Sequence, residues 1–112
     1  MPSAGPPPPY PDPFRTPVLG TVFARRAEVV HRLNPGDPCI LVPDAPDVED
    51  PTVWVHAPGG DVVGHLPTDI GRRLAPWMLA GGRCAATVEK VGTDDVESWR
   101  RVMIRVECRG GG

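Results

Sequence analysis

Residues 53–66 read VWVHAPGGDVVGHL, and this stretch decides the fold. From Val53 to His56 a valine alternates with a larger residue, and this period of two is typical of a strand with one buried face. The letters PGGD at residues 58–61 provide glycines for the positive φ angles of a tight turn, and the apolar run 62–66 follows. The stretch therefore predicts a β-hairpin.

Further runs on both sides of this hairpin also predict strands. They are 18–23 and 39–42 before it, and 84–89 and 102–108 after it. The two later runs alternate apolar and polar residues at a period of two, whereas the two earlier runs are short and mostly apolar. Between the second run and the hairpin, prolines and carboxylates at residues 43–51 predict an exposed acidic loop.

Two segments carry a helical pattern instead. A short helix is expected at 27–33, and a longer one is expected to start at Thr68, whose hydroxyl suits a cap. The apolar face of the longer helix consists of Ile70, Leu74, Trp77 and Met78. Because Pro76 lacks a backbone donor, we expect a kink or break there before Gly81 and Gly82 end the helix.

Six short strands, with one main helix between the fourth and the fifth, predict a mainly β fold: a small OB-like or SH3-like barrel. Closing the sheet removes the open edges that a small antiparallel sheet would expose. We place this domain at residues 18–109. The proline-rich segment 1–17 is expected to be a disordered or polyproline-II-like tail, and 110–112 a short glycine tail.

The 112 residues carry a formal net charge of −2, which provides no overall attraction to a polyanion. A nucleic-acid contact would therefore need a local group of arginines. The three cysteines lack CxxC spacing and form no zinc pattern with the histidines, so we expect reduced core cysteines and no bound metal. The sequence shows no catalytic motif, cofactor fingerprint or membrane-length apolar run, and a cytoplasmic protein that is not an enzyme is expected.

Four pieces of the sequence, taken in order, resemble the HIRAN domain family. They are VLGTVF at 18–23, LNPGDP at 33–38, VWV at 53–55 and VGHLP at 63–67. The resemblance covers residues 18 to about 108. It implies a barrel that binds the 3′-hydroxyl end of single-stranded DNA, as HIRAN domains do when fused to remodelling helicases, and a role in DNA repair or replication-fork processing.

The resemblance also implies nucleic-acid-binding residues. Phe23 stands where the family has an aromatic residue at the end of the first strand, which would stack on a base. His65 and Thr68 match polar positions near the hairpin end, and Glu49 keeps a carboxylate of the family's pocket loop. The residues themselves add four candidates for phosphate or base contacts, namely Arg25, Arg26, Arg72 and Trp99.

A protein-interaction adaptor is the alternative reading. Residues 46–49 read PDVE where HIRAN domains have Asn-Pro-aromatic-Asp, so one stacking ring of the family's pocket has no counterpart. Trp54 and Trp99 fall outside the apolar register of their predicted strands and would face a surface. An adaptor would contact its partner through these indoles or through the proline-rich tail.

Overall fold

A computed structural model describes residues 8–10, 13–23, 25–93 and 95–110. The elements are β1 (Phe14–Pro17), α1 (Arg26–His31), β2 (Pro38–Pro43), β3 (Val53–His56), β4 (Val62–His65), α2 (Thr68–Leu79), β5 (Arg83–Val91), α3 (Ser98–Arg101) and β6 (Val102–Arg109). The six strands form one antiparallel sheet in the order β1-β6-β5-β2-β3-β4. The prediction of a small mainly β barrel with its main helix between the fourth and fifth strands is confirmed.

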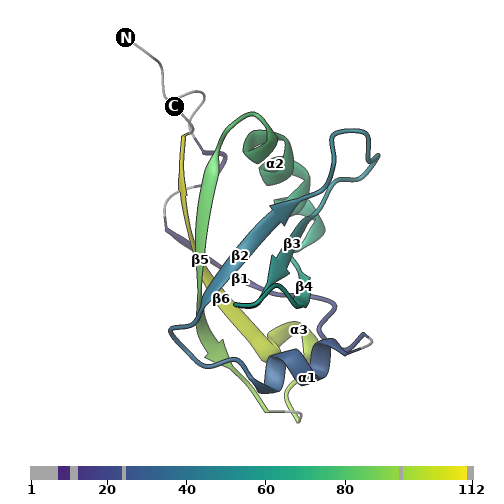
Figure 1. The fold of residues 1–112 in the computed structure, drawn as a ribbon, viewed down its shortest axis with the longest axis vertical. Helices are drawn as coiled ribbons and strands as arrows, with labels where there is room; N and C mark the ends of the chain where they lie inside the picture. Colours follow the sequence, from purple (N-terminus) through teal and green to yellow (C-terminus); the bar gives the residue numbers. More distant parts are fainter. Residues whose placement is uncertain (1–7, 11–12, 24, 94, 111–112) are drawn as a thin grey trace.

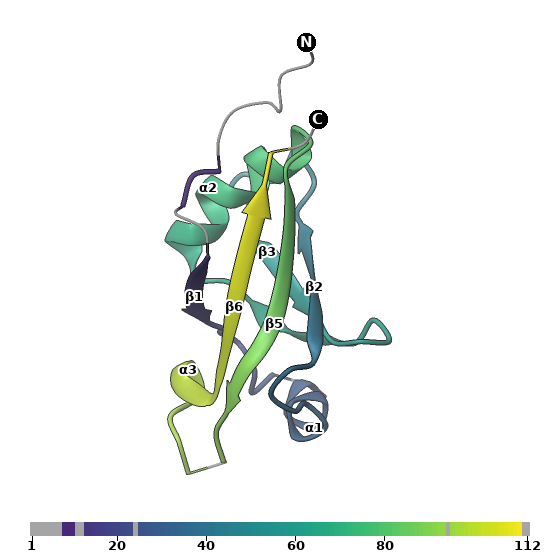
Figure 2. The same cartoon turned by 90° about the vertical axis from the view of Figure 1, so that its left-hand side faces the viewer.

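The sheet curls until its two edges meet at one point (Figures 1 and 2). Leu19, which follows the edge strand β1, forms an antiparallel bridge with His65, the last residue of the other edge strand, β4. Both hydrogen bonds of this bridge are formed, with N···O distances of 2.8 and 3.0 Å. The bridge joins the first and last strands of the sheet, so part of each edge is paired.

The inside of the curled sheet holds the hydrophobic core. Period-two alternation places Val53 and Val55 of β3, and Ile104 and Val106 of β6, on the inner face, where all four are fully buried. Figures 1 and 2 show α2 lying over one end of the barrel, while α1 and α3 lie at the other end. No helix in the described part of the chain is long and apolar enough to cross a membrane.

The structure corrects the predicted start of the domain. The first strand is Phe14–Pro17 rather than 18–23, and it lies within the segment expected to be a tail. Pro17 is tolerated because Val18 donates to the Val102 carbonyl (2.9 Å), and by alternation the backbone nitrogen of residue 17 faces the open edge of β1. The proline therefore removes no hydrogen bond from the sheet. The rest of the tail prediction falls mostly on residues 1–7 and 11–12, and the end of the glycine tail on 111–112, which lie outside the described residues.

The main helix also differs from its prediction. Thr68 is the first helical residue and Pro67 occupies the cap position, with no side-chain hydrogen bond to the helix. The helix continues past Pro76 to Leu79 rather than ending there. The carbonyl that loses its helical partner is that of Arg72, which is itself an exposed residue, so water can solvate it.

Candidate nucleic-acid interface

The candidate site is built around the bridge that joins the two edges of the sheet. Gly20 directly follows Leu19 and has a φ angle of +71°, which turns the chain away from the sheet. A Cβ atom on Gly20 would lie 3.1 Å from Nε2 of His65 and 3.2 Å from the Arg26 guanidinium. Glycine at this position therefore lets the imidazole and the guanidinium pack against the turn.

Arg26, at the start of α1, lies against two aromatic rings. Its guanidinium carbon is 5.7 Å from the centre of the Phe23 ring and 5.4 Å from the centre of the Trp54 ring. One guanidinium nitrogen donates to the carbonyl of Gly20 at 2.9 Å. Cation–π attraction and this hydrogen bond together fix the side chain next to both rings.

Trp54 is held from two further sides. Its indole nitrogen donates to a carboxylate oxygen of Asp44 at 2.8 Å, and its ring meets the imidazole of His65 edge to face, with 5.7 Å between centroids. Trp54 and His65 are direct partners across β3 and β4. Nδ1 of His65 lies 2.8 Å from the Leu66 carbonyl, which fixes the orientation of the imidazole. We call Phe23, Arg26, Trp54 and His65 the Arg26 cluster.

The outer part of the Arg26 cluster is open to solvent. The Phe23 side chain is 62% exposed and its neighbour Val22 is 51% exposed, although both are large apolar residues. Within the part of the chain that the structure describes, neither Arg25 nor Arg26 forms an ion pair with a carboxylate. An exposed ring beside such arginines is able to accept a planar base on its face and a phosphate at its edge.

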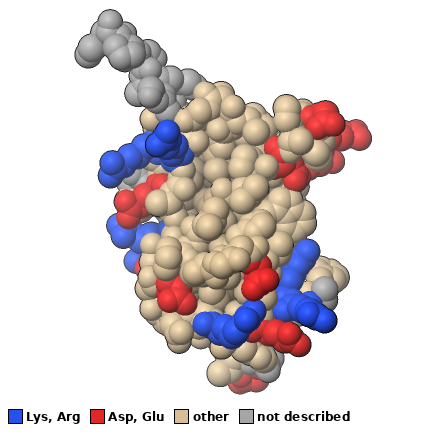
Figure 3. Space-filling view, viewed as in Figure 1, with Lys and Arg blue, Asp and Glu red and all other residues tan. Residues whose placement is uncertain are grey.

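Charge is not uniform over this face of the molecule. Figure 3 shows basic side chains near α1 with some acidic ones among them and a second basic group on the left of the view, whereas the β2–β3 loop is strongly acidic. Both ribbon views place that loop at the end of the barrel opposite α1. A polyanion would therefore be repelled by the loop end.

The structure brings together only some of the predicted site residues. Phe23, Arg26 and His65 meet in the Arg26 cluster, and the exposed Arg25 adjoins it in the chain. Glu49 is exposed in the acidic loop, away from the cluster, and Arg72 of α2 pairs with Asp50 of that loop at 3.7 Å. Neither residue takes part in the contacts that hold Phe23, Arg26 and His65 together, so their predicted contact with nucleic acid stays a prediction.

Thr68 and Trp99 also lie outside the Arg26 cluster. Thr68 is an exposed residue at the start of α2, and none of the contacts that hold the cluster involves it. Trp99 belongs to α3 rather than to the last strand, and its ring is 57% exposed with the Arg100 guanidinium carbon 5.6 Å from its centre. It lines a hollow of about 390 Å³ with Pro17, Lys90, Gly92, Val96, Arg100 and Met103.

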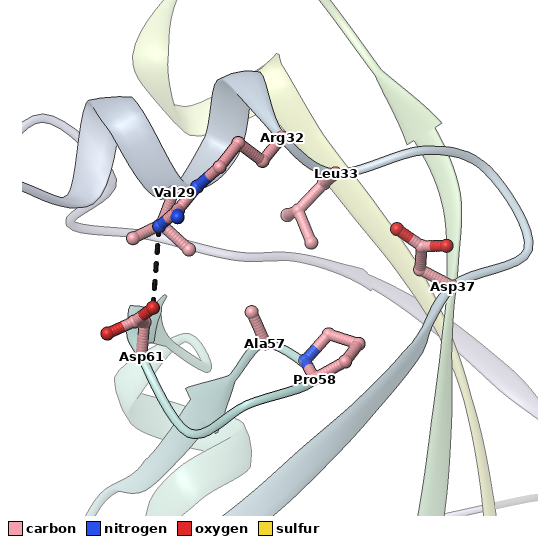
Figure 4. Close-up of a pocket in the computed structure, with 7 residues that line it drawn as sticks. All are labelled: Val29, Arg32, Leu33, Asp37, Ala57, Pro58 and Asp61. Atoms are coloured by element: carbon pink, nitrogen blue, oxygen red, sulfur yellow. Dashed lines mark hydrogen bonds and ion pairs between the residues drawn. The ribbon is translucent and has the colours of Figure 1, made fainter.

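A second hollow lies between α1 and the β3–β4 turn (Figure 4). Its volume is about 290 Å³, and Arg32 and Asp61 form an ion pair across its mouth at 3.4 Å. Both of these side chains are well exposed, so the pair contributes little to stability. The residues that line the hollow are Val29, Arg32, Leu33, Asp37, Ala57, Pro58 and Asp61, and none of them was predicted as a site residue.

Sequence reasoning did not place Trp54 or Gly20 in the site. The out-of-register position of Trp54 predicts a surface indole that contacts a protein partner, and nothing in the local sequence places it beside Arg26. Among the described residues, no group of three histidine, cysteine or acidic side chains is arranged to hold a metal ion. Comparison of the chain with protein-family models, with curated proteins and with solved structures found no match.

Proposed function

We propose that the chain is a binding module for single-stranded nucleic-acid ends, and that the Arg26 cluster is its contact surface. The observation that carries this proposal is the packing of the Arg26 guanidinium against Phe23 and Trp54, with the Phe23 ring exposed. The HIRAN resemblance supports the same choice, because its first-strand aromatic and its hairpin-end polar position correspond to Phe23 and His65. A cytoplasmic, non-catalytic protein that acts in DNA repair or at replication forks forms part of the proposal.

In this proposal the aromatic, basic and imidazole side chains contact different parts of the nucleic-acid end. The exposed face of Phe23 stacks on a terminal base, and Arg25 and Arg26 contact the adjacent phosphates. His65 lies beside Gly20, where its imidazole is available to the terminal sugar hydroxyl. The net charge of −2 keeps nonspecific attraction to the backbone weak, so the cluster must supply the affinity locally.

Fluorescence anisotropy tests the proposal. Short labelled single strands that end in a 3′-hydroxyl or a 3′-phosphate are titrated at low salt with the wild type, Phe23→Ala and Trp99→Ala. Loss of one stacked base costs about 1–3 kcal/mol, so Phe23→Ala should raise Kd by about fivefold or more. Trp99→Ala is the matched control, because Trp99 is also an exposed ring beside an arginine but lies in another hollow.

Comparison of the two nucleic-acid ends and of several salt concentrations distinguishes end binding from general binding to phosphates. Preference for the 3′-hydroxyl over the 3′-phosphate supports capture of an end rather than of an internal segment. Contact with single-stranded phosphates predicts that log K falls with log salt at a slope of about −0.7 per phosphate. Equal loss of binding in Phe23→Ala and Trp99→Ala, or no binding at low salt, would overturn the proposal.

The hollow at Trp99 supports a second candidate function, a protein-interaction adaptor. Val96, Met103 and Pro17 provide apolar walls around an indole that is more than half exposed. Aromatic side chains of this kind are enriched at protein interfaces. If the labelled nucleic acids do not bind, this candidate is tested by titrating an immobilised proline-rich peptide with the wild type and with Trp99→Ala. Equal signals from both proteins would count against it.

A further inference from the structure

Two cysteines lie opposite each other in neighbouring strands. Cys84 is near the start of β5 and Cys108 is near the end of β6, and the antiparallel register pairs them directly. Both side chains lie on the inner face of the sheet, since Cys108 is 4% exposed and half-buried Cys84 packs against the same core. Their side chains therefore leave the sheet on the same side, next to each other.

Backbone hydrogen bonds show whether Cys84 and Cys108 form a hydrogen-bonded or a non-hydrogen-bonded pair of the antiparallel ladder. Val88 of β5 donates to the Asp37 carbonyl at 2.8 Å and accepts from Gly36 at 2.7 Å, so its peptide groups face β2 and not β6. The register from Val88 to Arg83 is regular, so by alternation the peptide groups of Cys84 also face away from β6.

The same reasoning applies to the other strand. The carbonyl of Val102 accepts from Val18, so it faces β1, and alternation along β6 makes the peptide groups of Cys108 face β1 as well. Cys84 and Cys108 thus form a non-hydrogen-bonded pair. In such pairs the Cα atoms are about 4.5 Å apart and the side chains approach closely. Disulfides need a Cα separation of about 4.4–6.8 Å, so the strands need not move to be linked.

We propose that Cys84 and Cys108 are a redox-responsive pair that forms a reversible disulfide across β5 and β6. Both cysteines are thiols in the structure, as is Cys39. The link would close the end of the sheet near α2, opposite α1 and the turn that carries Phe23 (Figures 1 and 2). Its formation does not depend on the proposed nucleic-acid function.

The third cysteine is excluded from this reaction by position and by chemistry. Cys39 of β2 pairs with Ala86, so it is diagonal to Cys84, and diagonal neighbours in a sheet are about 7–8 Å apart. Burial, with a smaller contribution from the Asp37 carboxylate, raises the pKa of Cys39 to about 11. Its thiolate fraction at neutral pH is therefore very small, and the thiolate is the reacting form.

The oxidant required is a low-molecular-weight disulfide such as oxidised glutathione. The Cys84 thiolate, which is more accessible than Cys108, attacks one sulfur of the reagent, whose S–S bond breaks and releases one glutathione thiol. The Cys108 thiolate then attacks the Cys84 sulfur and releases the second glutathione thiol. Two protein thiols are oxidised, one reagent disulfide is reduced to two thiols, and the protein protons pass to the released thiols through solvent.

Thiol mapping of the full chain tests this proposal. The protein is incubated with oxidised glutathione, denatured, alkylated and digested, and an untreated sample is processed in parallel. We expect the peptides of Cys84 and Cys108 to be joined with loss of the two thiol hydrogens, and only Cys39 to be alkylated. Dithiothreitol should restore three alkylated cysteines, and Cys39→Ala should form the same link at the same rate.

Two single variants separate the steps of the reaction. Cys108→Ser should accumulate a stable glutathione adduct on Cys84, because the second thiol is missing. Cys84→Ser should react far more slowly, because Cys108 is buried. The proposal would be overturned by three alkylated cysteines after oxidation, by a lasting adduct on wild-type Cys84, or by a disulfide that includes Cys39. Failure of the protein to bind single-stranded nucleic acid in the anisotropy assay would not affect it.

Discussion

Single glycines decide how closely the chain can approach itself at the barrel's closing point. A Cβ atom on Gly64 would lie 2.2 Å from the Leu19 carbonyl oxygen, far inside van der Waals contact. Leu19 is the residue that bridges His65, the neighbour of Gly64. One hydrogen atom in place of a side chain therefore allows the edges of the sheet to join and sets the position of His65 in the Arg26 cluster.

Gly64→Ala should push Leu19 away and weaken the bridge to His65. We expect a loss of about 1–3 kcal/mol in the free energy of unfolding, as for other overpacked sites. Amide hydrogen exchange should also become faster at His65 and Leu19. Gly36→Ala is the control for backbone strain without a clash: its φ of +96° disfavours any side chain, but a Cβ there meets nothing within 4 Å, so stability should fall without selective loss of protection at His65. Unchanged protection of His65 in Gly64→Ala would contradict this account.

The raised pKa of Cys39 predicts how the free energy of unfolding depends on pH. Burial raises the pKa of Cys39 from its ordinary value of 9.0 to about 11 in the folded chain. The unfolded chain releases this proton first, so the contribution of Cys39 to stability is complete below pH 9 and is lost as pH rises to about 11. Urea titrations should show wild-type stability falling relative to Cys39→Ala by up to about 1.4 kcal/mol per pH unit in that window. Parallel pH profiles would refute the assignment.

At the scale of the element, proline has different consequences in a strand and in a helix. Pro17 ends an edge strand with its nitrogen facing outward, so no sheet hydrogen bond is lost. Pro76 lies inside α2, where the missing donor leaves one helical hydrogen bond unformed. The helix persists because Leu74, Ala75 and Trp77 bury its apolar face against the barrel.

Pro76→Ala should therefore stabilise the protein. A restored helical hydrogen bond and relief of crowding outweigh the greater freedom of the unfolded chain, for a net gain of about 1–2 kcal/mol. Urea denaturation monitored by circular dichroism measures the change. Pro35→Ala is a control of opposite sign, because Pro35 lies in a turn outside the helices and its loss only adds freedom to the unfolded chain. Equal or lower stability of Pro76→Ala would show that packing has already accommodated the proline.

At the scale of the whole molecule, the first and last parts of the chain depend on each other. Residues 14–17 pair with residues 103–106, and the bridge at Leu19 then ties the same segment to β4. Tyr10 extends the contact, with its hydroxyl 3.2 Å from the Asp69 carbonyl and its ring 5.3 Å from that of Phe14. The N-terminal segment is therefore a structural part of the barrel from at least Phe14 onward.

Two truncations test this dependence. Deletion of residues 1–9 should leave the thermal midpoint nearly unchanged, because the sequence there is proline-rich and has few apolar residues to bury. Deletion of 1–17 should lower the midpoint and broaden the transition, because it removes β1 and uncovers the buried β6. Similar midpoints for the two truncations, measured by circular dichroism, would argue that β1 is dispensable.

Much of the fold could be predicted from local sequence, and less of the site. Period-two alternation located β3, β5 and β6, the glycine turn and the apolar run after it located β4, and the apolar spacing from Ile70 to Met78 located α2, because these patterns report on local turns and on which side of an element is buried. The strand predicted at 18–23 is wrong, since a β-rich composition does not reveal that Gly20 turns the chain there. The HIRAN resemblance implies Phe23 and His65, whereas their proximity to Arg26 and Trp54 depends on contacts between distant segments of the chain.

The sequence by itself determined the β-hairpin at 53–66, the strands β2, β5 and β6 and the place of the main helix, because these depend on spacing between near neighbours. Only the tertiary structure decided that Phe14 pairs with Val106, that Leu19 meets His65, and that Cys84 faces Cys108. These contacts join residues far apart in the chain, and no local period encodes which strands become neighbours. Register and closure are set by burial of one shared core, which exists only once the whole sheet has curled.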